Sequence, residues 1–279
     1  MRVRPGSVRG LAQGVTLIAG LWLATQSAAA QGRIPSDCIA LAEAGPRITR
    51  VQARAPQPAD QVRIRYLGHA SFAIETSQVL AVTDYTGQIG NPTIVPDIAT
   101  MNDAHDTHFT DRPDPRIPLV LRGWPVEGVA AAIDIDTGDM RVRNVTTDLR
   151  GPFGEGARKN GNSIFVFEAA GLCIGHLGHL HQIPTAAHYA AIGRLDVVMV
   201  PVDGAYTMDV AEMADVVRRF NPRIVLPMHW FNPEGLARFL VQLNKDYVIT
   251  VSDQPQMTVS RATLPDRPEV VVLQPALLP

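Results

Sequence analysis

Hydrophobic and polar residues alternate with a period of two in the first part of the chain. Val62, Ile64 and Tyr66 alternate with two arginines, which is typical of a strand with one buried face. Similar alternation or short apolar runs predict further strands over 71–75, 79–83, 131–135, 140–145, 163–167 and 172–175. Turn residues separate 131–135 from 140–145, and 163–167 from 172–175. Each of these two pairs of strands is therefore predicted to form a hairpin.

The pattern changes to helical spacing in the second part of the chain. Helices are predicted over 186–192 and 209–220, and a third helix follows the capping residue Asn232. Apolar strands are predicted between and after them, over 196–202, 223–227, 248–251 and 270–273. Strands followed by strand–helix alternation predict one mixed α/β (α+β) domain over 61–279, with helices covering the sheets.

The N-terminus has the features of a secretory signal peptide. Three arginines precede an apolar stretch over 11–24, and small residues end at Ala30. A membrane anchor is the alternative, but this stretch is shorter than the roughly 20 residues that span a bilayer. We therefore predict a signal peptide over 1–30 and a periplasmic or secreted protein. Residues 31–60 are predicted to be a leader and a proline-containing linker.

Composition narrows the classes of partner. Apolar residues make up 46% of the chain, charged residues 19%, and the net charge is −2, as in ordinary globular proteins. No run of lysine or arginine predicts nucleic-acid binding, and no apolar segment after the signal peptide is long enough to span a membrane. Cys38 and Cys173 are too few for a disulfide scaffold, but they could form one bridge in an oxidising compartment. The sequence leaves their pairing and the oligomeric state open.

The candidate chemistry lies in the eight histidines, of which six fall in the three segments 102–108, 176–181 and 227–230. Each segment follows a predicted strand, which for the first segment is taken to be 99–102, and strand ends at one sheet edge are a usual place for α/β sites. Imidazole and carboxylate at this spacing suit a divalent cation such as Zn²⁺. His188 lies within a predicted helix and is expected to be a surface or packing residue.

Several strand ends resemble those of one family. They are Tyr66-Leu67-Gly68-His69, Val82-Thr83-Asp84, Ile174-Gly175-His176-Leu177-Gly178, Pro201-Val202-Asp203-Gly204 and Leu226-Pro227-Met228-His229. With these segments the chain resembles the metallo-β-lactamase fold family, in its broad branch of metal-dependent hydrolases, over about 62–251. The resemblance implies a four-layer αββα sandwich with one or two metal ions at the sheet edge.

The metal-binding signature of that family is altered here. H-x-H-x-D-H is replaced by Asp103-x-His105-x-Thr107-His108, and the bridging aspartate of the family falls on His179. The resemblance therefore implies the metal ligands Asp103, His105, His108, His179 and His229, with Asp148 as a further candidate in a segment that lacks the family's third histidine. It also implies that Asp84, Asp203 and His69 lie behind the ligands and orient them.

This ligand set predicts a zinc-dependent hydrolase, with one or two ions and a small-molecule substrate. The resemblance implies that a metal-bound hydroxide attacks an ester, lactone, amide or phosphoester. One alternative is a metal- or ligand-binding protein on the same fold in which catalysis is lost. Another is a periplasmic structural or interaction protein without metal.

Overall fold

A computed structural model describes residues 36–39, 58–150 and 157–279. The signal peptide predicted over 1–30 and most of the predicted leader lie outside the described residues. Among the described residues, no helix is both long enough and apolar enough to cross a membrane.

The first of two sheets has six strands in the order β13-β1-β2-β3-β4-β5. The strands are β1 (Val62–Gly68), β2 (Ser71–Glu75), β3 (Leu80–Val82), β4 (Ile98–Met101), β5 (Leu119–Arg122) and β13 (Gln256–Val259). The pairs from β13 to β3 are antiparallel, whereas β3, β4 and β5 run parallel. The alternation predicted for β1 is confirmed, because Val62, Ile64 and Tyr66 are buried on one face.

The second sheet has eight strands in the order β12-β14-β11-β10-β9-β8-β7-β6. The strands are β6 (Asp134–Asp136), β7 (Met140–Arg150), β8 (Ala157–Ala169), β9 (Leu172–His176), β10 (Val197–Pro201), β11 (Ile224–Met228), β12 (Val248–Val251) and β14 (Glu269–Val272). Both predicted hairpins, β6–β7 and β8–β9, are confirmed. The strands from β9 to β12 are parallel, so their carboxyl ends share one edge.

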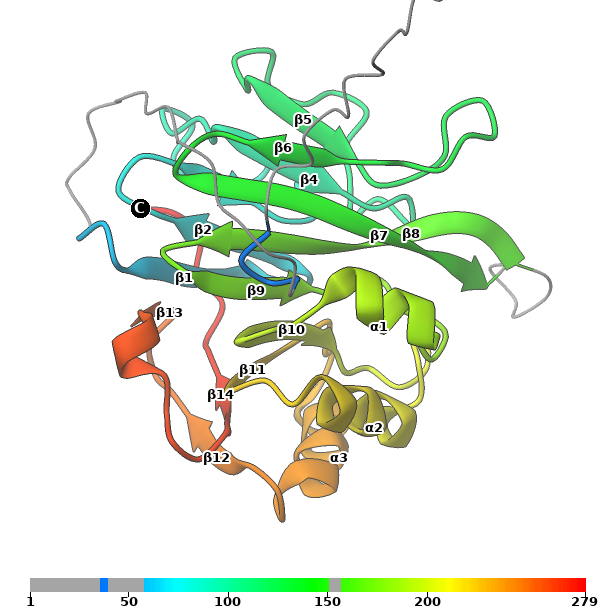
Figure 1. Cartoon of the computed structure of the whole chain (residues 1–279), viewed down its shortest axis with the longest axis vertical. Coiled ribbons are helices and arrows are strands. Elements are labelled where there is room, and N and C mark those ends of the chain that lie inside the picture. The colour runs from blue at the N-terminus through cyan, green and yellow to red at the C-terminus, as the bar shows by residue number, and fades with distance from the viewer. Residues whose placement is uncertain (1–35, 40–57, 151–156) are drawn as a thin grey trace, which may run out of the picture. The chain divides into compact units, whose positions relative to one another are not determined.

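The predicted helices are confirmed as α1 (Ala186–Ile192), α2 (Val210–Phe220) and α3 (Pro233–Leu243), and a short 3₁₀ helix, η1 (Arg261–Thr263), follows β13. Thr185, Asp209 and Asn232 cap the three α helices by accepting hydrogen bonds from backbone N–H groups. Each α helix precedes a strand of the eight-stranded sheet, and all three pack on that sheet (Figure 1).

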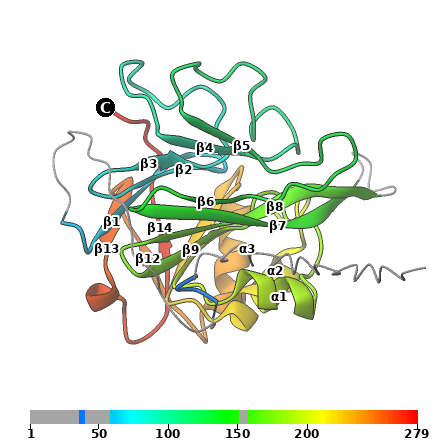
Figure 2. The same cartoon turned by 45° about the horizontal axis from the view of Figure 1, so that its top comes forward.

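The two sheets lie one over the other, with the three α helices on the far side of the eight-stranded sheet (Figure 2). Phe72, Phe165 and Phe167 belong to the core between the two sheets. A second core joins the eight-stranded sheet to the helices. Over the outer face of the six-stranded sheet the described residues place loops, whose Tyr85 and Ile117 pack on that face. The two-sheet fold is confirmed, but in the described residues loops take the place of helices in the fourth layer.

A disulfide between Cys38 and Cys173 resolves the pairing that the sequence left open. It attaches the leader segment Ser36–Ile39 to the start of β9. Two more contacts hold this segment, since the Cys38 carbonyl accepts from the Arg194 N–H over 3.0 Å and Ser36 Oγ donates to Glu168. The described part of the leader is therefore packed on the domain that it precedes.

Candidate metal centre

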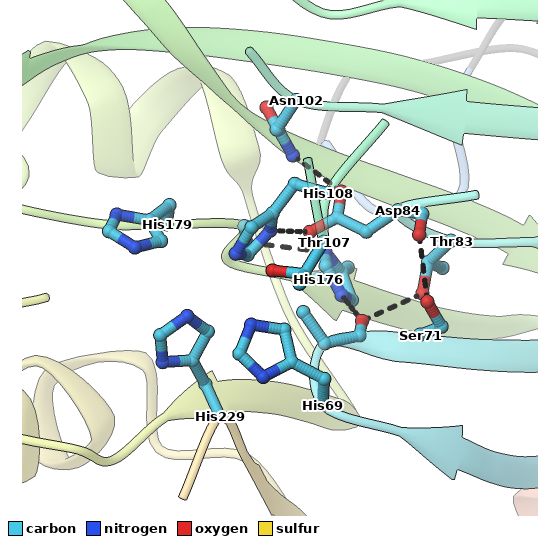
Figure 3. A network of polar contacts seen from close by, with 12 residues as sticks. His69, Ser71, Thr83, Asp84, Asn102, Thr107, His108, His176, His179 and His229 are labelled. Carbon is cyan, nitrogen blue, oxygen red and sulfur yellow. Dashed lines mark hydrogen bonds and ion pairs between the residues drawn. The ribbon is translucent and has the colours of Figure 1, made fainter. Parts of the chain in front are cut away.

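Five histidines are brought together by loops that follow four strands. His69 lies between β1 and β2, His105 and His108 follow β4, His179 follows β9, and His229 follows β11 directly. Figure 3 shows the rings of His69, His108, His179 and His229 around one space. These residues are up to 160 positions apart in sequence. They meet because the two sheets pack face to face and present these strand ends at the same edge.

The spacing of the rings is that of a ligand cluster. His69, His105, His108 and His229 each offer one ring nitrogen, and these nitrogens lie within 4.8 Å of one another. The fifth ring belongs to His179, whose centroid is 4.9 Å from each of the centroids of His105, His108 and His229. The structure therefore brings together four of the predicted ligands and adds His69 to them.

Two buried carboxylates fix the orientation of two of these rings. His108 donates from Nδ1 to Asp84 over 2.5 Å, and His229 donates from Nδ1 to Asp203 over 2.9 Å. With Nδ1 engaged, each ring directs Nε2 into the cluster. Asn102 in turn donates to the other oxygen of Asp84 over 2.9 Å. Asp84 and Asp203 thus lie where the resemblance implied, behind two histidines whose tautomer they set.

Three ring nitrogens of the cluster are buried and unpartnered within the described residues: Nε2 of His69, of His108 and of His229. A buried polar atom without a hydrogen bond is costly, and native proteins satisfy most such atoms. Three imidazole nitrogens facing one another match the donor set of a bound transition-metal ion. The residues present therefore fit a metal.

A chain of imidazoles extends from the cluster through His105. The Nε2 atoms of His105 and His179 are 3.1 Å apart, and His179 Nδ1 is 2.7 Å from His181 Nε2. The backbone N–H of Arg150 donates to His181 Nδ1, which leaves the proton of a neutral His181 on Nε2. His181 then donates to His179, His179 donates to His105, and His105 donates from Nδ1 to the Thr107 hydroxyl over 2.7 Å.

Backbone strain concentrates at the same place. His69, Asp84 and His229 have φ values of 51°, 40° and 57°, in the left-handed region that non-glycine residues seldom adopt. Two of these backbones are joined, because the His229 N–H donates to the His69 carbonyl over 2.7 Å. Strain of this kind persists where surrounding contacts enforce it, and it clusters at functional sites.

Burial and mutual repulsion lower the pKa values of three of the rings, those of His69, His108 and His179. Burial and the neighbouring His229 and His105 lower the pKa of His69 to about 3. Burial likewise holds the pKa values of His108 and His179 well below the ordinary value. Neutral imidazole is the form that binds metal, so these rings are ready for an ion at neutral pH.

The pKa values of the two carboxylates are shifted in opposite directions, although burial acts upward on both. Burial raises the pKa of Asp84 to about 6, against the effect of its neighbours. For Asp203 burial also acts upward, but hydrogen bonds from His229, from the Thr207 hydroxyl and from backbone N–H groups outweigh it and hold the pKa well below its usual range. Asp203 is therefore a fixed anion behind His229.

Two predicted ligands are not brought into the cluster. Asp103 is partly exposed and forms an ion pair with Arg158 over 3.2 Å. Asp148 pairs with Lys159 over 2.6 Å and accepts from the Asn160 N–H. Each carboxylate is adjacent to a cation on the same surface, which satisfies its charge without a metal. The alignment of a family signature alone does not show such local partners.

The contacts of the remaining histidines distinguish their roles. His176 is buried, but Nε2 donates to the Ala70 carbonyl and Nδ1 accepts from the Gly178 N–H, so it is structural. His188 is at the third position of α1 and completes its capping box, in agreement with a surface role. His69 was expected behind the ligands, but its Nε2 joins them. His181 was not selected from the sequence, although its spacing of two residues from His179 is a signal for it.

The chain is similar in sequence to a known family of domains. Residues 63–229 match the family model of the beta-lactamase superfamily domain. A UPF0173 metal-dependent hydrolase of Thermococcus kodakarensis is 25% identical over 242 residues, which cover 77% of this chain and 97% of the relative. A UPF0173 metal-dependent hydrolase of Pyrococcus abyssi is 26% identical, over 61% of this chain and 84% of the relative.

Solved structures show the same fold. A Thermotoga maritima protein, assigned as a zinc-dependent hydrolase of the metallo-β-lactamase superfamily, has a TM-score of 0.54 and 24% identity, over 76% of this chain and 98% of its own. A metallo hydrolase of Ignicoccus hospitalis has a TM-score of 0.51 and 14% identity, over 78% of this chain and 97% of its own. Since the family model spans more than half of the chain, the chain belongs to the β-lactamase superfamily domain family and has the metallo-β-lactamase fold.

Proposed function

We propose that the protein is a metal-dependent hydrolase with one zinc ion, held by His69, His108 and His229. The observation that carries this proposal is the set of three buried, unpartnered Nε2 atoms that face one another. Three histidines are a sufficient ligand set for a catalytic zinc, which keeps one position open. His105 lies beside them, but its Nε2 accepts from His179 and its Nδ1 donates to Thr107, so it is not counted among the ligands.

We infer one ion rather than two because the cluster formed by the described residues contains histidines and no carboxylate that could bind an ion. Asp84 and Asp203 are engaged with Nδ1 atoms on the outer side of their histidines. Asp103 is paired with Arg158, and Thr107 stands where the family signature has a metal-binding aspartate. Without a carboxylate between two ions, their mutual repulsion disfavours a second one.

The ion would supply a polarised substrate bond and a coordinated water with a lowered pKa. The chain supplies orientation and access. Asp84 and Asp203 hold two rings in place and make their Nε2 atoms more basic. His108 and His229 are fully buried, whereas His69 and His105 are only half-buried. The cluster is therefore open on the side of His69 and His105, and a substrate approaches from there.

The reaction class we propose is hydrolysis of a small ester, lactone, amide or phosphoester. The relatives in Thermococcus and Pyrococcus are named metal-dependent hydrolases, and they match this chain over most of their length. The competing candidate is a metal-binding protein on the same fold that lacks turnover. It is favoured by one observation, the loss of the usual aspartate at Thr107.

We further propose that the protein works in the periplasm or outside the cell. The arginine-rich start and the apolar stretch before Ala30 support export. The Cys38–Cys173 disulfide supports it independently, because such bonds persist in oxidising compartments. N-terminal sequencing of protein from the native host should begin at Gln31; protein that retains Met1 would contradict export.

Metal analysis combined with a substrate panel tests the function. Protein purified without added metal should contain about one zinc ion per chain, and it should hydrolyse at least one member of an ester, lactone, amide and phosphoester panel. A chelator should abolish turnover and zinc should restore it. The double variant His108→Ala/His229→Ala should lack both zinc and activity. Bound zinc without turnover on the whole panel would favour the binding protein instead.

A further inference from the structure

Two exposed aromatic side chains lie beside the histidine cluster, on its accessible side. Phe231 is 58% exposed, and its ring centroid is 5.2 Å from that of His229 and 5.6 Å from that of His69. Tyr206 is 66% exposed, and its ring meets that of Phe231 at 5.5 Å with an interplanar angle of 72°. The two rings form a continuous aromatic surface from the cluster to solvent, which we call the aromatic rim.

The backbone that carries Tyr206 is held from both sides. Asp203 Oδ1 accepts from the N–H groups of Ala205, Tyr206 and Thr207, over 2.8, 2.5 and 3.1 Å. Arg150 Nη2 donates to the carbonyls of the same three residues, over 3.0, 3.2 and 2.8 Å. These six hydrogen bonds hold the backbone of Ala205, Tyr206 and Thr207, and so fix the position from which the exposed Tyr206 side chain extends.

The aromatic rim and the histidine cluster are both held by Asp203. The other oxygen of Asp203 accepts from His229 Nδ1 and from the Thr207 hydroxyl. One carboxylate therefore orients a cluster histidine and positions the loop of Tyr206. Phe231 follows His229 by two residues and is placed by the same strand end. The spacing between rim and cluster is thus fixed by the fold.

Single exposed apolar side chains are common on protein surfaces and need no explanation. Two adjacent aromatic rings at the mouth of a candidate active site are a different case, because an aromatic surface there binds a flat apolar group by stacking and by excluding water. Arg150, which holds the loop of Tyr206, is itself engaged through Nη2 with three carbonyls, and the two rings offer apolar contact to a ligand.

We propose that the aromatic rim binds an aromatic group of the substrate and selects aryl-bearing over small aliphatic substrates. This assignment rests on the proposed hydrolase function and names its substrate class. The ring of the substrate lies against Phe231 and Tyr206, and the scissile group then reaches the space between the histidines. Phe231 and Tyr206 determine specificity and take no part in bond cleavage.

Matched esters test the selection. Benzyl acetate and methyl acetate share the acyl group and differ only in the leaving group. The wild type should show a higher kcat/KM for benzyl acetate, and Phe231→Ala or Tyr206→Ala should lower the benzyl-to-methyl ratio about tenfold or more. Val241→Ala is the control, because Val241 is 64% exposed on α3, away from the cluster. An unchanged ratio in both rim variants would overturn the proposal.

A binding measurement separates this proposal from the hydrolase function. Saturation-transfer NMR with benzyl alcohol, the product of benzyl acetate hydrolysis, reports contact without turnover. The signal should be strong for the wild type and for Val241→Ala, and it should be weak for Phe231→Ala and Tyr206→Ala. Equal signals in all four proteins would contradict the rim as an aryl site even if the protein hydrolyses esters. Zinc content should stay the same in all four, which excludes damage to the cluster.

Discussion

His229 donates from Nδ1 to Asp203 over 2.9 Å, and both side chains are buried. This bond directs the unpartnered Nε2 of His229 into the histidine cluster. The same relationship recurs between His108 and Asp84. Two buried carboxylates behind these histidines therefore orient the site before any ion binds.

Replacing Asp203 should weaken metal binding without removing a ligand. Asp203→Asn removes the charge that holds the Nδ1 proton of His229, and loss of such outer partners typically costs 10–100-fold in metal affinity. Zinc affinity, measured by competition with a chromophoric chelator, should fall by this factor. Asp103→Asn is the matched control, since Asp103 is paired with Arg158 outside the cluster, and its affinity should equal that of the wild type.

Removal of a cluster ring should lower the zinc content. His229→Ala and His69→Ala each delete a buried nitrogen that has no other partner, so each should retain well below one zinc ion per chain by mass spectrometry of the metal. His188→Ala removes a ring from α1 instead and should keep its zinc. Equal zinc in all three variants would refute the ligand assignment.

Gly178 lies next to two asparagines that hold the loops of the cluster. Its φ is +60°, and a Cβ there would lie 2.4 Å from Asn162 Oδ1 and 2.6 Å from Asn102 Nδ2. Gly178→Ala should therefore lower the free energy of unfolding. The loss should be about 1–3 kcal/mol larger than for an alanine at a glycine that has a positive φ but no close neighbour. Gly128→Ala is that comparison, because Gly128 has φ +80° and nothing within 4 Å. Chemical denaturation of both variants gives the difference.

The disulfide should contribute substantially to stability. It links residues 135 positions apart, and a bond that closes a long loop typically stabilises a domain by about 2–4 kcal/mol. Cys38→Ala/Cys173→Ala should lower the free energy of unfolding by this amount, and a reductant should lower the Tm of the wild type but not that of the variant. A Tm that is insensitive to reductant in both would contradict the expectation.

Acid should destabilise the metal-free protein. The pKa of His69 is lowered to about 3 in the folded state, by burial first and then by its neighbours, against about 6.5 in the unfolded chain. The unfolded state therefore binds more protons as the pH falls below 6.5, and stability is lost progressively from there towards pH 3. Thermal unfolding after chelation should show this fall, and His69→Gln should make it shallower. An identical pH dependence in both proteins would contradict the shift.

Sequence patterns predicted most of the elements because these depend on neighbouring residues. The caps Thr185, Asp209 and Asn232 start the helices where they were expected. Strands such as β5 and β13 were not predicted, since they are short and their pairing partners are distant in sequence. The loop layer over the six-stranded sheet was also not predictable, because it depends on how separate loops pack on that face.

The alternation of strands and helices, the resemblance to the metallo-β-lactamase fold and the three histidine segments at strand ends can all be recognised from neighbouring residues. Which of these side chains meet depends instead on how the two sheets and their loops pack. Asp103 and Asp148 lie in the expected segments, but neighbouring cations satisfy them. His69 joins His229 through a contact between two distant loops. A metal site is formed by side chains that are close in space, and the local pattern of a sequence does not show which distant residues come close.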